Sequence, residues 1–249
     1  MPAHGHVSEV FVSFQGEGVH AGRRQLFVRM AGCPLRCRYC DTPASLLPTA
    51  SCRVLGPDGA RDLPNPLDAA TLDATVAALV AAAPPLHAVA LTGGEPLAQA
   101  EFLAGWLAGA RALPPVLLET AGILPARLER LLPLVAIVSL DFKCPTNTGE
   151  RARWDEHEAC LRAAVAAGRD VYVKMPVDDG TSPDEVERGA SIIAAIDGRV
   201  PLLLTPLTPP DGTRLTIHPA TLDALHARAS RHLVDVRIQP QLHKVLGIL

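Results

Sequence analysis

The sequence predicts an α/β protein whose core is a partial (β/α) TIM-like barrel with parallel strands. Three observations lead to this class. After residue 84, short apolar runs alternate with Ala-, Leu- and Arg-rich stretches of helical period. The runs recur about every 20–35 residues, a spacing that suits strand–helix–strand crossovers. Polar residues gather where the runs end, as they do at the active-site face of barrel enzymes.

The expected elements can be placed in order along the chain. The first strand, 26–30, leads directly into a cysteine-rich loop. Six further strands are predicted at 86–92, 115–120, 134–141, 170–175, 200–205 and 233–239. Helices are predicted between them at 99–112, 125–132, 153–167, 183–196 and 218–230. Residues 43–70 are rich in Pro, Gly and Asp, so we expect an irregular excursion with a short hairpin around 56–59.

Composition narrows the function classes. With 249 residues the chain can bury a full core, and we expect a single domain over 1–249. A net charge of −3 gives no support for a nucleic-acid or membrane partner, and no apolar run approaches the roughly 20 residues needed to span a bilayer. No signal peptide is recognisable, so we expect a cytoplasmic, reducing setting. Lysine is scarce, which directs attention to its few positions: Lys143, Lys174 and Lys244.

The cysteine loop is the strongest chemical signal. Cys33, Cys37 and Cys40 form a CxxxCxxC pattern that can direct three thiolates into one small volume. Structural zinc sites and ordinary iron–sulfur carriers take four protein ligands. Either Cys52 or a nearby His supplies the fourth ligand, or a [4Fe–4S] cluster keeps one iron open for a small molecule.

The second alternative agrees with a known pattern. CxxxCxxC with Tyr39 before the last cysteine, followed by "LTGGEP" at 91–96, resembles the radical S-adenosylmethionine (SAM) superfamily. The resemblance implies a radical SAM core in which SAM binds the open iron and is cleaved to methionine and a 5′-deoxyadenosyl radical. Gly93 and Gly94 would allow close backbone approach to a ligand, and Glu95 would accept from the SAM ammonium group.

A longer stretch narrows the resemblance to one family. "VSFQGEGVHAGRRQLFVRMAGCPLRCRYCDT", "LLETAG" and "PQLHK" are similar to the 7-carboxy-7-deazaguanine synthase family, nearly from end to end of the chain. The resemblance implies a radical ring contraction of 6-carboxy-5,6,7,8-tetrahydropterin to 7-carboxy-7-deazaguanine with loss of ammonia, on the route to queuosine and other 7-deazapurines. It also implies Mg²⁺, a homodimer and an electron donor such as flavodoxin or ferredoxin.

The same resemblance assigns roles to individual residues. The cluster ligands are the three loop cysteines, and Thr42 matches the Mg²⁺ ligand. SAM contacts are expected from Tyr39, Cys40, Asp41, Gly94, Glu95, Ser139, Asp141 and Lys143. Substrate contacts are expected from Phe14, Gln15, Gly16, Arg29, Thr92 and His243. The planar fork of Arg29 suits the pterin carboxylate, and Gln15 suits the amide–guanidine edge.

Several alternatives stay open at this level. Lys143 either pairs only with Asp141 or also contacts SAM, and the role of Glu119 is open. A radical SAM enzyme with another substrate, such as a glycyl-radical activase or a peptide-modifying enzyme, would share the cysteine and "GGEP" motifs. A non-catalytic zinc or iron–sulfur binding protein would need a closed four-ligand site that includes a residue such as Cys52.

Overall fold

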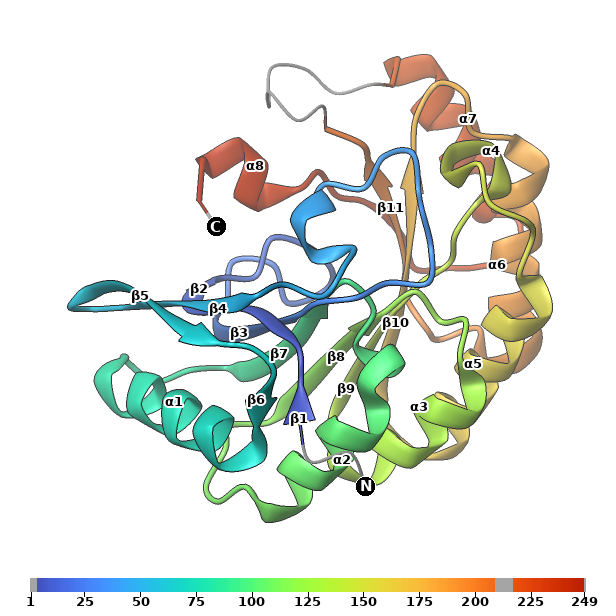
Figure 1. Cartoon of the computed structure of the whole chain (residues 1–249). Helices are drawn as coiled ribbons and strands as arrows, with labels where there is room; N and C mark the ends of the chain where they lie inside the picture. Colours follow the sequence, from blue (N-terminus) through green and yellow to red (C-terminus); the bar gives the residue numbers. More distant parts are fainter. Residues whose placement is uncertain (1–3, 209–216, 249) are drawn as a thin grey trace.

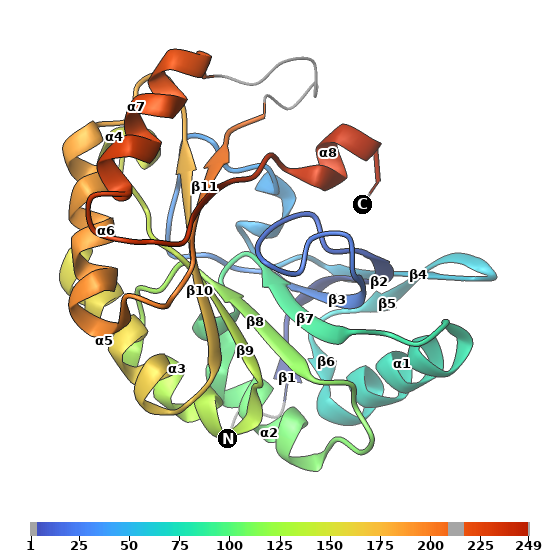
Figure 2. The ribbon, with the colours of Figure 1, turned by 180° about the vertical axis from the view of Figure 1, so that it is seen from behind.

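The computed structural model describes residues 4–208 and 217–248. Its centre is a ten-stranded sheet that curls around a polar interior, with helices on the outer face (Figures 1 and 2). From one edge to the other the strands are β12 (Val236–Ile238), β11 (Leu202–Pro206), β10 (Asp170–Val177), β9 (Ile137–Asp141), β8 (Val116–Thr120), β7 (Ala88–Gly93), β3 (Arg24–Met30), β2 (Val7–Phe14), β4 (Ser51–Gly56) and β5 (Gly59–Pro64). A separate two-stranded sheet joins β1 (His4–Gly5) to β6 (Leu67–Asp68).

The seven strands from β12 to β3 are mutually parallel and correspond to the seven predicted strands. The two edge strands, β12 and β5, do not pair with each other, so the barrel is partial and open, as the sequence predicts.

Helices follow the parallel strands and cover the convex side of the sheet. The α-helices are α1 (Ala69–Ala82), α2 (Ala100–Gly109), α3 (Pro125–Leu131), α4 (Pro145–Thr148), α5 (Trp154–Ala166), α6 (Pro183–Asp197), α7 (Pro219–Ala229) and α8 (Leu242–Leu246). Short 3-10 turns lie at η1 (Pro43–Ser45), η2 (Pro96–Gln99) and η3 (Leu132–Leu134). The five predicted helices are confirmed as α2, α3, α5, α6 and α7. No helix of the described residues is both long and apolar enough to cross a bilayer.

The N-terminal part differs from the sequence prediction in three respects. Strand β2 was not predicted, and it runs antiparallel to β3. Helix α1 was also not predicted; it begins where Asp68 caps the Thr71 amide at 2.7 Å. The hairpin around 56–59 exists, but its strands β4 and β5 extend over most of the supposed excursion and add to the main sheet.

Side-chain alternation along the strands creates the functional interior. On β10, Val173 and Met175 face the helices, whereas Tyr172 and Lys174 face inward. An apolar inner layer fills the lower part of the barrel with residues such as Phe11, Phe27, Ala90, Leu117 and Leu203. Further along the same strands, the inward positions become charged or polar: Glu9, Arg29, Thr92, Glu119, Asp141, Lys174 and Thr205. The period of two therefore gives the barrel a dry floor and a polar upper layer.

Candidate active site

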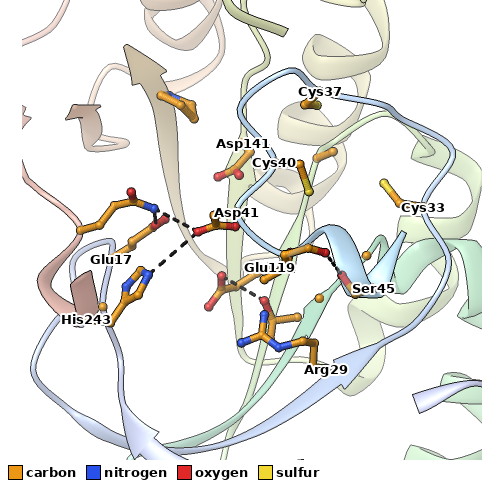
Figure 3. Close-up of a pocket in the computed structure, with 18 of the residues that line it drawn as sticks. Glu17, Arg29, Cys33, Cys37, Cys40, Asp41, Ser45, Glu119, Asp141 and His243 are labelled. Carbon is orange, nitrogen blue, oxygen red and sulfur yellow. Dashed lines mark hydrogen bonds and ion pairs between the residues drawn. The ribbon is translucent and has the colours of Figure 1, made fainter. Parts of the chain in front are cut away.

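One cavity of about 540 Å³ opens above this polar layer at the carboxyl ends of the strands (Figure 3). The cysteine loop covers one side, and the loop after β2 and the C-terminal segment cover the other. All three lysines of the chain, Lys143, Lys174 and Lys244, line this cavity. Their scarcity in the sequence was therefore a usable signal.

The three loop cysteines line the cavity together, as predicted. Backbone bonds anchor the loop: Gly32 N donates to Ser45 O at 2.8 Å, and Arg38 N donates to Thr148 O at 3.0 Å. Burial raises the pKa of the Cys33 thiol to about 11 and that of Cys37 above its ordinary value. Because metal binding needs thiolates, proton release has to accompany loading of this site.

The three sulfurs lie farther apart than the ligands of a single tetrahedral ion do. Among the described residues, the only group of three His, Cys, Asp or Glu whose ligand atoms all lie within 4.8 Å of one another is Glu17, Asp41 and His243. Thiolates around one zinc ion, at about 2.3 Å from it, would lie roughly 3.8 Å apart. Cys52 lies in the apolar core beside β2 and is absent from the cavity wall, so the closed four-ligand alternative based on Cys52 is not supported.

The "GGEP" segment supports the cysteine loop from below. A Cβ on Gly94 would come within 2.4 Å of Gly32 O and 2.7 Å of Ser45 O. The glycine is thus required by packing against the chain itself, and not only by a ligand. The Glu95 carboxylate accepts from Leu97 N, Thr120 Oγ1 and Ala121 N, at 2.7–2.9 Å, which occupies three of its roughly four acceptor positions. Burial raises the pKa of Glu95 despite these donors.

A buried charge network crosses the middle of the cavity. Lys174 Nζ lies 2.6 Å from Glu17 Oε2, 3.3 Å from Asp141 Oδ1 and 3.8 Å from Glu119 Oε2. Lys143 Nζ lies 2.9 Å from the other oxygen of Asp141 and 5.5 Å from the Tyr39 ring centroid. Lys143 therefore does pair with Asp141, and it also contributes a cation to the cavity wall.

The two ammonium groups and their carboxylates hold one another ionised. Burial alone would lower the pKa of Lys143 and Lys174, but the adjacent carboxylates outweigh it and hold both pKa values well above the ordinary range. Burial would likewise raise the pKa of Glu17 and Asp141, and the lysines reverse that effect, so that both pKa values are lowered. At neutral pH this layer is therefore a fixed array of full charges.

His157 on α5 holds two of the strand-end loops together. Its Nε2 accepts from Lys143 N at 3.1 Å, and its Nδ1 donates to Gly122 O at 3.1 Å. The ring is fully buried and stacks on Phe142. Burial lowers the pKa of His157 to about 4, so the ring stays neutral and keeps one donor and one acceptor.

Arg29 lines the cavity below the cysteine loop in the view of Figure 3. Its Nε donates to Glu9 Oε2 at 3.0 Å, and the guanidinium lies 5.5 Å from the Phe11 ring centroid. Within the described part of the chain, neither Nη group has a hydrogen-bond partner. The Arg29 guanidinium is thus held at Nε, and its two Nη groups are available to bind a ligand.

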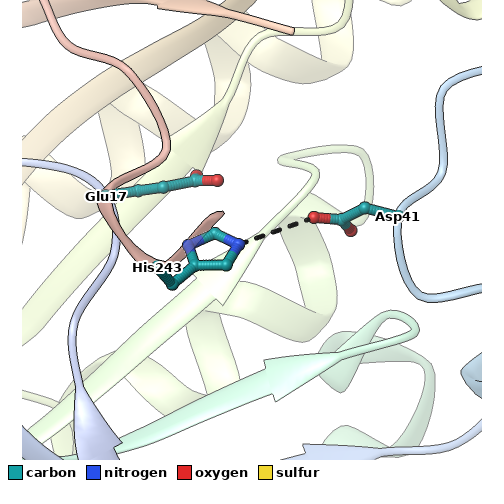
Figure 4. Close-up of side chains that lie close together, drawn as sticks. All are labelled: Glu17, Asp41 and His243. Atoms are coloured by element: carbon teal, nitrogen blue, oxygen red, sulfur yellow. Dashed lines mark ion pairs between the residues drawn. The ribbon is translucent and has the colours of Figure 1, made fainter. Parts of the chain in front are cut away.

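The C-terminal segment covers the same side of the cavity as the loop after β2. Leu242 N donates to Gly16 O at 2.9 Å, and Gln241 Nε2 bridges Glu17 Oε1 at 2.8 Å and Asp41 Oδ2 at 3.3 Å. His243 packs on Gly16 and points its Nε2 at Asp41, 4.0 Å away (Figure 4). Because Lys174 and Gln241 already bond Glu17, we interpret the Glu17–Asp41–His243 group as a hydrogen-bonded seam and not as a metal site.

Most residues predicted for the site meet in this cavity. Its wall includes Phe14, Gln15, Gly16, Arg29, Tyr39, Asp41, Thr42, Thr92, Gly94, Glu95, Asp141, Lys143 and His243, together with the three cysteines. Ser139 is the exception, because it is fully buried in β9 and does not line the cavity. The predicted site set omitted other residues of the wall, namely Glu9, Glu17, Glu119, Lys174 and Gln241.

Comparison with known proteins agrees with this geometry. The model of the radical SAM superfamily matches residues 27–190. A 7-carboxy-7-deazaguanine synthase from Geobacter sulfurreducens is 38% identical over 98% of this chain and 97% of its own length, and one from Methanothermobacter thermautotrophicus is 30% identical over 97% of each. The chain belongs to the 7-carboxy-7-deazaguanine synthase family of the radical SAM superfamily. In fold it is similar to QueE from Escherichia coli, with a TM-score of 0.56 and 19% identity over 96% of this chain and 95% of that one.

Membership of the superfamily implies SAM and a [4Fe–4S] cluster, and the site residues fit both. Three thiols share one cavity wall at a spacing too wide for a single ion, which suits a multi-iron cluster with three protein ligands. Beside them, Asp141 and Asp41 offer carboxylate oxygens for a cosubstrate that carries both an ammonium and a sulfonium charge. The Tyr39 hydroxyl is buried and has no partner among the described residues.

Proposed function

We propose that this chain catalyses the conversion of 6-carboxy-5,6,7,8-tetrahydropterin to 7-carboxy-7-deazaguanine with loss of ammonia, a radical SAM lyase step in 7-deazapurine and queuosine synthesis. One observation carries the proposal beyond family membership. The three cysteines and the free fork of Arg29 line the same cavity from different sides. A radical generated near the cysteines would therefore form within reach of a substrate whose carboxylate is bound by arginine.

In this proposal Cys33, Cys37 and Cys40 hold the cluster, which together with SAM supplies a one-electron cleavage that yields a hydrogen-abstracting radical. The protein supplies position and a fixed electrostatic environment. Arg29 binds the substrate carboxylate through its free Nη groups, while Glu9 holds its base. The charged layer of Lys174, Glu17 and Asp141 needs no reorganisation when substrate arrives, since its charges are already paired.

Thr42 is proposed as the protein ligand of Mg²⁺. It lines the cavity at the N-cap of η1, and its side chain makes no capping hydrogen bond there, so the hydroxyl is available. Mg²⁺ takes few protein ligands and completes its octahedron with water and substrate oxygens. A carboxylate held by Arg29 would be a suitable further ligand.

The assembly and setting of the enzyme belong to the same proposal. A homodimer is proposed by family resemblance, and exposed apolar side chains at Ile238 on edge strand β12 and at Val245 and Leu246 on α8 offer surface for a second copy. A one-electron donor such as flavodoxin or ferredoxin is proposed as the reductant. The free state of all six cysteines supports a reducing, cytoplasmic setting.

Variants at the substrate end test the proposal against a radical SAM enzyme with another substrate. Arg29→Gln should reduce turnover of the tetrahydropterin severely, because a neutral amide replaces the fork that binds its carboxylate. Slow SAM cleavage by dithionite without substrate should persist, since the cysteines are unchanged. Unaltered pterin turnover in Arg29→Gln would overturn the assignment. Exposed Arg199→Gln, on the turn after α6, is the matched control.

A further inference from the structure

A line of polar side chains runs through the barrel interior, from its closed end to the cavity. It consists of His87 at the start of β7, Gln25 on β3, Gln15 after β2 and Glu119 on β8. Gln25 is fully buried and Gln15 is only 3% exposed. Burial of two amide side chains is costly unless each finds hydrogen-bond partners.

The orientation of the Gln15 amide is forced by its neighbours. The Glu17 backbone N–H, which can only donate, lies 3.1 Å from Gln15 Oε1. The Glu119 carboxylate, an acceptor when ionised, lies 2.7 Å from Gln15 Nε2. An amide flipped by 180° would place donor against donor and acceptor against acceptor. The observed orientation is therefore the one that satisfies both neighbours.

The orientation of Gln15 in turn fixes the orientation of Gln25 and the tautomer of His87 at the closed end of the barrel. The second Nε2 proton of Gln15 goes to Gln25 Oε1 at 3.1 Å, which leaves Gln25 Nε2 facing His87 Nδ1, also at 3.1 Å. Since Gln25 Nε2 can only donate, His87 Nδ1 has to be unprotonated, and its proton has to reside on Nε2. Each member thus fixes the polarity of the next.

We propose that Gln25 is a positioning residue for the reaction: the His87–Gln25–Gln15 relay fixes the direction of the Gln15 amide and so holds the Glu119 carboxylate in its place in the cavity wall. This inference rests on the proposed function, because it is read out through the pterin. It also revises the part expected of Gln15. Both of its amide protons are used within the protein and its oxygen accepts from Glu17 N, so at most one acceptor position of Gln15 is left for the substrate and its main action is through Glu119.

The relay requires a neutral His87, and the groups around the ring favour that state. Burial, the neighbouring His20 ring at 4.6 Å between centroids and the Arg23 charge lower the pKa of His87, while Asp170, which lies 3.5 Å from His20 Nε2, opposes them. Protonation below the ordinary histidine range would place a second donor against Gln25. We therefore expect the KM for the pterin to rise as the pH falls below the ordinary histidine range, with little change in the KM for SAM.

Two substitutions of Gln25 separate a relay from a packing role. Gln25→Leu keeps the volume but removes the acceptor for Gln15, and the KM for the tetrahydropterin should rise about tenfold. Gln25→Glu keeps an acceptor toward Gln15, and His87 can shift its proton to Nδ1 to face the new carboxylate. Its KM should therefore lie closer to wild type than that of the leucine variant.

A packing role predicts the reverse order, because a carboxylate in a fully buried position is worse tolerated than leucine. Thr75→Val, which removes a buried hydroxyl bond to Thr71 O in α1, is the control for general loss of stability. Equal KM values in wild type and Gln25→Leu, or a glutamate variant worse than leucine, would overturn the relay. If the wild-type holoenzyme makes deoxyadenosine but no deazaguanine product, the proposed function fails instead.

Discussion

The N-terminal part of the chain, 4–82, and the repeating part, 88–206, contribute to the site in different ways. The repeating part alternates parallel strands with helices, and its functional side chains stand at inward positions near strand ends. The N-terminal part adds antiparallel strands and an irregular loop, and it carries Arg29 and the three cysteines that we propose as cluster ligands. Regular structure supplies Lys174, Asp141 and Glu119 of the charged layer, whereas the irregular loop supplies the three cysteines.

The contrast shows that irregular backbone is used where several side chains must converge at short sequence spacing. Three thiols within eight positions cannot all face one cavity from a single strand, because alternate residues point to opposite faces. The loop solves this and is then fixed from below by Gly94 and Glu95 of the repeating part. Substitutions in the two parts should therefore fail differently.

The largest expected effect lies in the loop. Cys37→Ala should lose its cluster on anaerobic reconstitution and fall to background in both SAM cleavage and pterin turnover, because only two thiolates remain. The fold should persist, since the thiol lies at the cavity wall and outside the apolar core. Iron analysis and far-ultraviolet circular dichroism measure the two halves of this prediction. A full complement of iron in Cys37→Ala would contradict the proposal that the three loop cysteines hold the cluster.

For a substitution in the charged layer we expect a loss of stability as well as of activity. Lys174→Met leaves Glu17 and Asp141 without a shared cation and should cost about 3 kcal/mol of unfolding free energy at pH 7. In the wild type both carboxylates have lowered pKa values, so their contribution is present above the unfolded-state pKa and is lost as the pH falls through the folded-state pKa.

Without Lys174, burial raises the pKa of Glu17, whereas Lys143 still lowers that of Asp141, so the variant should lose less stability on acidification through Glu17. The difference between wild type and Lys174→Met should therefore shrink between pH 7 and pH 4, as urea unfolding at several pH values can measure. A constant difference would mean that the lysine contributes packing only. Arg228→Met, which removes a half-buried ion pair with Glu187 outside the cavity, is a suitable control with a smaller effect.

A smaller effect is expected at His157, which connects two strand-end loops. His157→Phe leaves Lys143 N and Gly122 O without partners and should cost about 2 kcal/mol of stability. Because Lys143 lies near Tyr39, on the side of the cavity where we propose that SAM binds, the KM for SAM should rise more than the KM for the pterin. His157→Gln, which can place an oxygen near Lys143 N, should recover part of the loss.

The smallest effect belongs to the cysteine outside the loop. Cys52→Ala should retain a normal cluster and normal turnover, with about 1 kcal/mol of lost stability from the apolar core. Metal analysis checks this directly. Lost iron or stoichiometric zinc in the variant protein would restore a four-ligand site.

How much the sequence predicts also differs between the two parts. The repeating part was predicted from periodicity alone, because each strand and helix is long enough to show its pattern. In the N-terminal part, the Pro, Gly and Asp residues at 43–70 predict irregular structure, whereas the structure has a hairpin there that extends the sheet, and the Ala-rich helix α1 after Asp68 is not predicted. Cys33, Cys37, Cys40 and the glutamate of "GGEP" line one cavity as the sequence predicts, because the residues of each motif are close in sequence, and their roles as ligands stay predictions.

Long-range partners were not predictable. Lys174 bonds Glu17 across 157 positions, and Gln15 bonds Glu119 across 104. No spacing rule connects such residues, because their contact depends on which strands become neighbours. The scarcity of lysine was the one sequence signal for Lys174.

The central claim is that the enzyme catalyses a radical ring contraction of a carboxylated pterin in this cavity. Mass spectrometry of an anaerobic reaction containing reconstituted enzyme, SAM, dithionite, Mg²⁺ and 6-carboxy-5,6,7,8-tetrahydropterin tests it most directly. We expect 7-carboxy-7-deazaguanine to appear only when SAM is present. Deoxyadenosine without that product would retain the radical SAM chemistry and contradict the pterin assignment.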